Sequence, residues 1–245
     1  EITQEALEMV QSGAALSSSA ATIVYNPNWN KGVVGIVASR LVEAFYKPTI
    51  VLTKSNDFIT GSARSVAGFD LYEAIDSCAD LMENFGGHVY AAGLTLREEN
   101  LPEFVRRIEE FISTRITQEM LTPFTEIDAR LEFSQITPKF FRLLKQFQPF
   151  GPGNTNPVFQ TENVYDGGKG RKVGADGVHM KLDLIDEKQP FHQIPAIAFN
   201  MSEYFDYIKA GNPFDICYSI VENYYRGNST LQLRIKDIRE REEPI

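Results

Sequence analysis

One glycine-rich stretch decides how the chain is interpreted: Phe85-Gly86-Gly87-His88-Val89-Tyr90-Ala91-Ala92-Gly93-Leu94. It contains three glycines, two adjacent alanines and one of the three histidines. We expect the glycine pair to end an amphipathic helix over 69–84 and to turn the backbone sharply into a strand over 89–96. Small side chains on that strand let another backbone or a ligand come close. Considered alone, such a stretch is more often a structural turn than a functional site. Whether it is functional here has to be inferred from the rest of the chain.

The first half of the chain alternates helices with strands. Apolar periodicity predicts strands over 20–25, 49–53 and 58–65, and a buried helix over 31–46. A further helix starts near Pro102, which suits the first turn. This alternation predicts an α/β domain.

Two segments of this half could bind an anion. Gly61-Ser62-Ala63-Arg64-Ser65 combines a guanidinium with two hydroxyls, which suits a phosphate, although a solvated turn explains the same residues. Trp29-Asn30-Lys31-Gly32 lies at a predicted helix start, where backbone N–H groups attract anions. Simple capping of that helix by Asn30 is the alternative.

The second half is dominated by short strands. They are predicted over 127–133, 158–165, 169–173, 178–185, 193–199, 214–222 and 230–238, with helices over 139–147 and 202–209. Thr137 and Pro138 supply a cap and a first-turn proline for the earlier helix. Short strands interrupted by one helix predict a small barrel, most simply an OB-fold.

This barrel has a candidate surface for single-stranded nucleic acid. Basic residues on neighbouring predicted strands are joined by tyrosines nearby in sequence: Lys169, Arg171, Lys172, His179 and Lys181, with Tyr165, Tyr224 and Tyr225. OB-folds bind single strands through basic grooves with aromatic platforms. A solvated hairpin with half-buried tyrosines fits the spacing equally well.

Composition limits the possible functions. The 245 residues carry a formal net charge of −9, so any nucleic-acid contact depends on a local basic patch. Cys78 and Cys217 are far apart and outside any Cys/His cluster, which argues against a zinc site and for a reduced, cytoplasmic chain. No apolar run approaches the ~20 residues of a membrane span, and no signal peptide opens the chain. Because the chain starts at Glu1 and not at Met, we expect a piece of a longer protein.

Three motifs in order resemble the DHHA1 domain of the DHH phosphoesterase superfamily: the 29–40 segment, the 61–65 segment and Gly86-Gly87-His88-Val89-Tyr90-Ala91-Ala92-Gly93. The second half resembles the OB domain that follows DHHA1 in RecJ-type exonucleases, through its 150–154, 177–182 and 231–239 segments. The resemblance implies an α/β DHHA1 domain followed by a mostly-β OB-fold barrel. The expected boundaries are 1–12 for the end of an interdomain helix, 13–120 for DHHA1 and 121–245 for the OB domain with its linking helix.

The resemblance also implies a function. The parent would be a metal-dependent 5′-to-3′ single-stranded-DNA exonuclease of repair and recombination, with Mn or Mg held by a DHH domain whose Asp-His-His motif this sequence lacks. This piece alone is expected to be inactive and to bind no metal. It would hold single-stranded DNA and could contact single-strand-binding protein or other repair proteins, with no membrane contact.

The same resemblance assigns roles to residues of the first half. Those implied to bind phosphate or DNA are Ser62, Arg64, Ser65, Gly86, Gly87 and, more weakly, Lys31. His88 would support catalysis from the cleft. The alternatives are a stand-alone single-strand-binding or docking module, or an oligoribonuclease-type DHH phosphoesterase; enzymes of that type generally lack the OB barrel.

Overall fold

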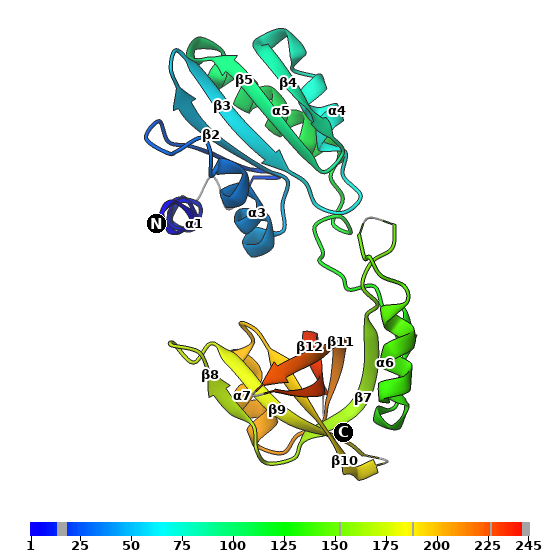
Figure 1. The fold of residues 1–245 in the computed structure, drawn as a ribbon. Helices are drawn as coiled ribbons and strands as arrows, with labels where there is room; N and C mark the ends of the chain where they lie inside the picture. Colours follow the sequence, from blue (N-terminus) through cyan, green and yellow to red (C-terminus); the bar gives the residue numbers. More distant parts are fainter. Residues whose placement is uncertain (14–18, 152, 188, 226, 242–245) are drawn as a thin grey trace. The chain divides into compact units, whose positions relative to one another are not determined.

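The chain folds into two compact units, residues 1–123 and 124–245, which are described separately (Figure 1). The computed structural model describes residues 1–13, 19–151, 153–187, 189–225 and 227–241. The first unit is mixed α/β and the second is strand-rich, as the sequence predicts. None of the helices in these described ranges is long and apolar enough to cross a membrane.

The first unit is built on a five-stranded sheet of order β1-β2-β3-β5-β4. The strands are β1 (Thr22–Tyr25), β2 (Thr49–Ser55), β3 (Phe58–Arg64), β4 (Met82–His88) and β5 (Ala91–Arg97). The β1–β2 pair is parallel and the others are antiparallel. Successive side chains of a strand point to opposite faces, and β3 accordingly alternates between half-buried and buried residues.

The two faces of this sheet are covered differently. The helices are α1 (Ile2–Ser12), α3 (Val34–Phe45), α4 (Leu71–Asp76) and α5 (Leu101–Arg115), with 3-10 turns at Ala79–Leu81 and Glu98–Asn100. Residues of α4 and α5 pack on one face against buried side chains of β2, β3 and β5. Residues of α1 and α3 pack on the other face against Val24 of β1 and Val51 of β2.

Helix α1 is fixed to the first unit by polar contacts as well. The Trp29 Nε1–H donates to Glu5 Oε2 at 3.0 Å, and Asn26 Nδ2 donates to Glu5 Oε1 at 2.7 Å. The buried Thr53 hydroxyl donates to the Trp29 carbonyl at 2.7 Å. The two bonds to Glu5 tie α1 to the turn before α3, and the Thr53 bond ties that turn to β2.

The predicted helix over 69–84 is wrong in its second half. Helix α4 ends at Asp76, and Met82–His88 form strand β4. The predicted turn is also displaced: Gly86 and Gly87 lie inside β4, the hairpin turns at Val89 and Tyr90, and β5 begins at Ala91. The apolar residues after Cys78 fit both the helical and the strand period. The two glycines disfavour a helix, and β5 needs a neighbouring strand to pair with its backbone N–H and C=O groups.

The second unit is a closed ring of strands. Its sheet order is β6-β7-β11-β12-β10-β9-β8, and an additional β7–β9 pairing closes the ring. The strands are β6 (Ala129–Arg130), β7 (Phe159–Asp166), β8 (Arg171–Val173), β9 (His179–Asp186), β10 (Gln189–Ala198), β11 (Phe214–Tyr225) and β12 (Asn228–Glu240). The β10–β12 pair is parallel, and α7 (Phe205–Lys209) connects β10 to β11 after a 3-10 turn at Ser202–Tyr204. This five-strand closure matches the OB-fold expected from the sequence.

Helix α6 (Pro138–Lys145) begins as predicted. The Thr137 hydroxyl accepts the Phe140 N–H at 3.1 Å, and Pro138 occupies the first turn. The strand predicted over 127–133 is shorter: it is the two-residue β6, followed by a 3-10 turn at Phe133–Gln135. Phe133 is buried in the barrel core, and the turn is what places it there.

A buried carboxylate ties the barrel to its last strand. Asp215 accepts from Arg239 Nη2 at 2.6 Å, Arg241 Nε at 2.8 Å and the Asn163 N–H at 3.0 Å. Burial alone would raise the pKa of Asp215, but hydrogen bonds from the two arginines and Asn163 outweigh it and lower the pKa.

Candidate functional site

The motif residues of the first unit meet on one face of its sheet. Cross-strand partners point to the same face, and the register aligns them in two rows. Ser62, Gly93 and Gly86 form one row across β3, β5 and β4, and Arg64, Ala91 and His88 form the next. We call these six residues the open face. With strands about 4.8 Å apart, the Cα atoms of Arg64 and His88 lie roughly 10 Å apart across Ala91.

The open face has room above it. Gly86, Gly93 and His88 are exposed, although β5 is an inner strand of the sheet. Among the residues that the structure describes, a Cβ added to Gly86 would meet no atom within 4 Å, and one added to Gly93 would meet only the Gly61 carbonyl oxygen at 3.8 Å. Nothing in the described part of this unit requires glycine at these two positions, and the resulting shallow trough can admit a ligand or a second backbone.

Gly61 and Gly87 have a different reason to be glycine. A Cβ on Gly61 would lie 2.4 Å from Leu52 Cδ2, and one on Gly87 would lie 2.3 Å from the Ala91 carbonyl oxygen. Gly87 also has a φ of +156°. These two glycines are needed by the fold of the sheet.

Arg64 and Ser62 form one cluster at an edge of the open face. Arg64 Nη1 donates to Ser62 Oγ and to the Ala63 carbonyl, both at 2.8 Å. Gly35, in the first turn of α3, lies against them, because a Cβ there would be 3.1 Å from Arg64 Nη2 and 3.2 Å from Ser62 Oγ. The sequence prediction overlooked Gly35; its signal is a glycine inside an otherwise β-branched helical run.

His88 lies at the opposite edge. It is exposed, and its Nδ1 accepts the Tyr90 N–H at 3.4 Å. Among the residues that the structure describes, no three His, Cys, Asp or Glu side chains gather to hold a metal ion. Because His88 is exposed, it offers a hydrogen-bonding group to whatever lies over the trough.

Ser65 and Lys31 lie outside the open face. The Ser65 hydroxyl donates to the Phe69 carbonyl at 2.8 Å, and its N–H donates to the Tyr90 carbonyl at 3.0 Å, which fixes the turn after β3. Lys31 is exposed in the turn before α3. The alternative for this segment, simple capping of α3 by Asn30, is wrong: the Asn30 Oδ1 accepts the Gly32 N–H at 2.8 Å, and the N-cap is Val33.

The basic residues of the barrel divide between two faces. Arg171 of β8 pairs with Lys181 of β9, and both are exposed. Lys169 lines the same shallow groove of about 180 Å³. Lys172 pairs with the buried Met180, and its Nζ lies 5.3 Å from the Phe205 ring centroid. The expected single cluster is therefore wrong for Lys172, because neighbouring residues of a strand point to opposite faces.

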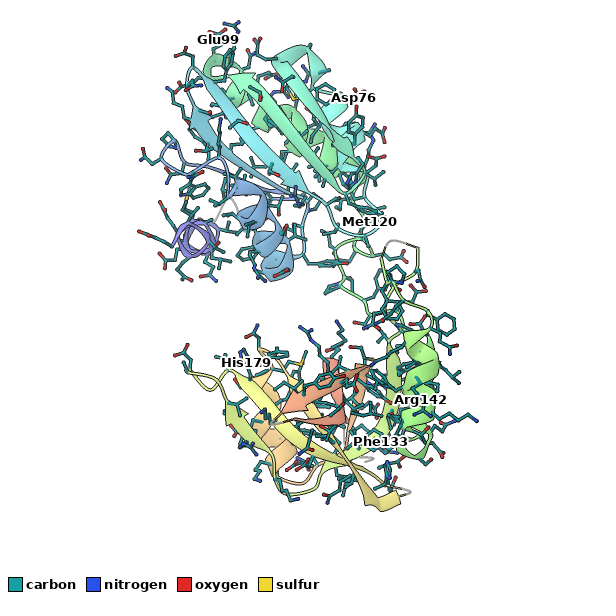
Figure 2. The ribbon with its side chains drawn as sticks, in the orientation of Figure 1. Asp76, Glu99, Met120, Phe133, Arg142 and His179 are labelled. Carbon is teal, nitrogen blue, oxygen red and sulfur yellow. The ribbon has the colours of Figure 1, made fainter. Side chains whose placement is uncertain are left out.

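The outer face of the barrel also includes two residues that sequence spacing missed, Phe199 and Arg234. Ile197 of β10 pairs with Lys181 on one side and with Arg234 of β12 on the other. Phe199, just past the end of β10, contacts both His179 and Arg234. Figure 2 labels His179 at the start of β9. The side chain of Tyr225, which was also predicted to belong here, lies outside the described part of the structure.

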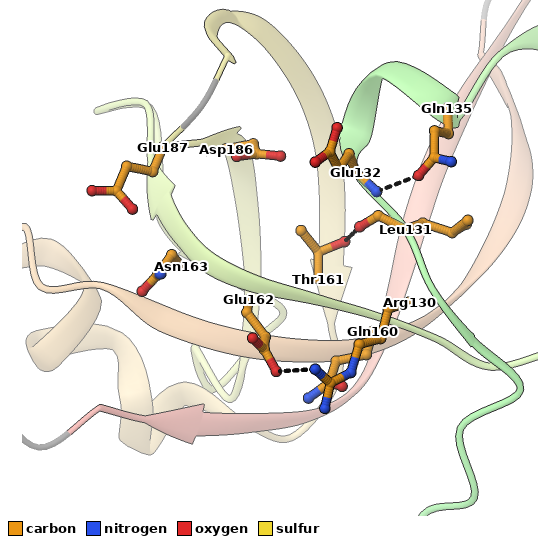
Figure 3. A pocket seen from close by; sticks show the side chains of 10 residues that line it. All are labelled: Arg130, Leu131, Glu132, Gln135, Gln160, Thr161, Glu162, Asn163, Asp186 and Glu187. Atoms are coloured by element: carbon orange, nitrogen blue, oxygen red, sulfur yellow. Dashed lines mark hydrogen bonds and ion pairs between the residues drawn. The ribbon is translucent and has the colours of Figure 1, made fainter.

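A separate hollow of the barrel has the wrong charge for nucleic acid. It has a volume of about 570 Å³ and lies beside β7 (Figure 3). Its carboxylates are Glu132, Glu162, Asp186 and Glu187, and its Arg130 is ion-paired with Glu162 at 3.3 Å. Phosphates would be repelled there.

Comparisons with known proteins agree with this architecture. The DHHA1 domain model matches residues 18–114, and the RecJ OB domain model matches residues 127–237. The first unit contains a DHHA1 domain and the second a RecJ OB domain.

Curated relatives and a solved structure match nearly the whole chain. The "Single-stranded-DNA-specific exonuclease RecJ" of Bacillus subtilis is 35% identical over 239 residues, covering 97% of this chain and 30% of that protein. The Haemophilus influenzae protein of the same name is 30% identical over 249 residues, covering 98% of this chain and 42% of that protein. The crystal structure of RecJ in complex with Mn²⁺ from Thermus thermophilus aligns with a TM-score of 0.75 at 24% identity, over 98% of this chain and 34% of that one. The chain belongs to the RecJ family and spans less than half the length of these relatives.

Proposed function

We propose that this chain is the substrate-binding C-terminal region of a 5′-to-3′ single-stranded-DNA exonuclease that acts in the cytoplasm in DNA repair and recombination. The observation that carries the proposal is the DHHA1–OB pair, shared over 97% of the chain with a relative named as a single-stranded-DNA-specific exonuclease. The oligoribonuclease-type alternative is disfavoured by the matched OB domain.

The open face supports a phosphate-binding role. Arg64 has donors beyond those bound to Ser62 and Ala63, and its planar fork suits a phosphate. The trough of Gly86 and Gly93 lets a sugar–phosphate backbone approach β5. His88 supplies a group at the far edge that can donate to or orient the strand.

The metal ions of the activity belong elsewhere in the longer protein under this proposal. The solved Thermus relatives hold Mn²⁺ or Mg²⁺. The described residues of this chain do not fit such ions, since no cluster of metal-ligating side chains is present among them. The role of this chain is therefore to bind and position DNA, and by itself it is expected to be inactive.

The test is exonuclease kinetics of the longer protein on 5′-labelled single strands. Arg64→Ala should lower kcat/KM about 10- to 150-fold, because a charge-assisted contact contributes about 1.5–3 kcal/mol. Arg106→Ala is the matched control: this arginine lies on α5, over the opposite face of the sheet, and is paired with Glu103 and Glu110. If Arg64→Ala matches the control, Arg64 is not a phosphate ligand. If the longer protein digests no single strands, the proposed function is wrong.

A second role for the barrel unit is docking of single-strand-binding or other repair proteins. An apolar groove of about 260 Å³ lies between α6 and β11, lined by Phe141, Leu144 and Ile220. Leu143 and Phe147 on and after α6 are exposed. A pull-down of purified single-strand-binding protein that survives Lys181→Glu but fails with Phe147→Ala would support docking, and the reverse pattern would oppose it.

A further inference from the structure

Phe199 is an exposed aromatic side chain held in a fixed position on the outer face of the barrel. It is 42% exposed and immediately follows β10. Because Ala198 pairs with Met180 in the antiparallel register, the next pair along is Phe199 and His179. The two rings meet edge to face, with centroids 5.1 Å apart and planes at 73°.

The surrounding groups restrict this ring. The Asn200 N–H donates to His179 Nδ1 at 3.0 Å, with Asn200 at a φ of +55° that asparagine tolerates. This bond fixes the imidazole that abuts Phe199. The Arg234 guanidinium carbon lies 5.2 Å from the Phe199 centroid, within cation–π range. A preordered ring loses little conformational entropy when a ligand stacks on it.

The neighbouring cations define what such a ligand must be. Lys181 and Arg234 flank Ile197 in one row, and Arg171 extends that row onto β8. Among the described residues, these three cations lie in no ion pair. A ligand that crosses this row and reaches Phe199 needs anionic groups at intervals and a flat apolar group beside them, as a single strand has in its phosphates and bases.

We propose that Phe199 is a base-stacking platform for single-stranded DNA, held in place by His179 and Arg234. The proposal rests on the proposed function and deepens it by separating two kinds of contact. Arg171, Lys181 and Arg234 contact phosphates, which makes binding depend on salt. Phe199 contacts a base, which adds an affinity that depends on the presence of the base and not on its identity.

The experiment compares two oligonucleotides with the same phosphates. Fluorescence anisotropy of the 245-residue chain is measured with a labelled oligo-dT and with an abasic oligonucleotide of equal length, at one salt concentration. Phe199→Ala should weaken oligo-dT binding about 5- to 150-fold and leave abasic binding within about twofold. Phe199→Trp should retain oligo-dT binding, which excludes misfolding of the barrel as the cause.

Phe124→Ala is the matched control, because Phe124 is 70% exposed and precedes β6, which lies at the opposite end of the sheet order from β8. It should bind both oligonucleotides like the parent chain. An equal loss on both oligonucleotides, or no loss with Phe199→Ala, overturns the stacking assignment and leaves the proposed function intact. If the parent chain binds neither oligonucleotide, single-strand binding by the barrel itself is wrong. Docking of a protein would then better explain the exposed Phe199 and the cationic row on the outer face.

Discussion

Gly86 and Gly87 are adjacent glycines with opposite surroundings, and separate alanine substitutions should have opposite effects. A Cβ on Gly86 meets no atom within 4 Å. A Cβ on Gly87 lies 2.3 Å from the Ala91 carbonyl oxygen and 2.5 Å from Ala92 Cα. Both of these atoms belong to the backbone of β5, and a third atom, Ala92 Cβ, lies at 2.8 Å, so the clash is relieved only if β4 separates from β5.

The magnitudes follow from these contacts. Overpacking costs about 1–3 kcal/mol, and a φ of +156° adds about 1 kcal/mol for a residue with a Cβ, so Gly87→Ala should destabilise the first unit by about 2–4 kcal/mol. Gly86→Ala creates no clash. It should be neutral or stabilise by up to about 1 kcal/mol, because alanine has less conformational freedom in the unfolded chain.

Urea unfolding followed by Trp29 fluorescence measures this difference. The chain has one tryptophan, and it is buried in the first unit, so its signal reports on that unit. In the longer protein, Gly86→Ala should also lower kcat/KM by about tenfold or more, because its methyl group enters the trough that the DNA backbone would occupy. Equal stability losses for the two variants would refute the clash argument. A stable Gly86→Ala variant with full activity would refute the trough as a binding surface.

Three further predictions concern contacts elsewhere. Glu5→Gln should lower the unfolding free energy of the first unit by about 1–2 kcal/mol, seen in Trp29 fluorescence, because it weakens a charge-assisted bond to the indole. Asp215 has a lower pKa in the folded than in the unfolded chain, so its stabilisation is complete above about pH 4 and is lost as the pH falls further. The protection factors of the β11 amides, which correct for the slower intrinsic exchange at low pH, should therefore fall on acidification, and Asp215→Asn should flatten that dependence. A methyl group on Gly35 would lie 3.1 Å from Arg64 Nη2, so Gly35→Ala should weaken oligonucleotide binding by the longer protein only while Arg64 is present. A double-mutant cycle with Arg64→Ala should therefore be strongly non-additive. Additive losses would show that Gly35 does not position Arg64.

Local sequence signals predicted most elements of the fold. Thr137 and Pro138 marked the start of α6, and the long apolar run over 31–46 contains α3. The region over 82–88 was mispredicted because its few apolar residues fit both the helical and the strand period. Only pairing with β5, which a single segment cannot reveal, makes it a strand.

The candidate sites were predictable to different degrees. Arg64 and His88 were chosen as candidates through their motifs, and their position in a common row follows only from the β3–β5–β4 register. Phe199 and Arg234 lie 35 positions apart in the sequence and meet through the parallel β10–β12 pair, which leaves no local signal. Lys172 was misplaced because a cluster in sequence was taken for a cluster in space, whereas the alternation of β8 divides it.

The net charge of −9 says less about nucleic-acid binding than the pairing of individual cations does. In the barrel unit, Lys145 is neutralised by Glu222, whose pKa falls to about 2 through hydrogen bonds from Lys145 and Ser229. Arg130, Lys209, Arg239 and Arg241 also face carboxylates. The row formed by Arg171, Lys181 and Arg234 lies in no ion pair within the described ranges, so its cations remain available for phosphates. Because the Debye length is about 8 Å at physiological salt, carboxylates on distant surfaces do little to oppose binding at that row.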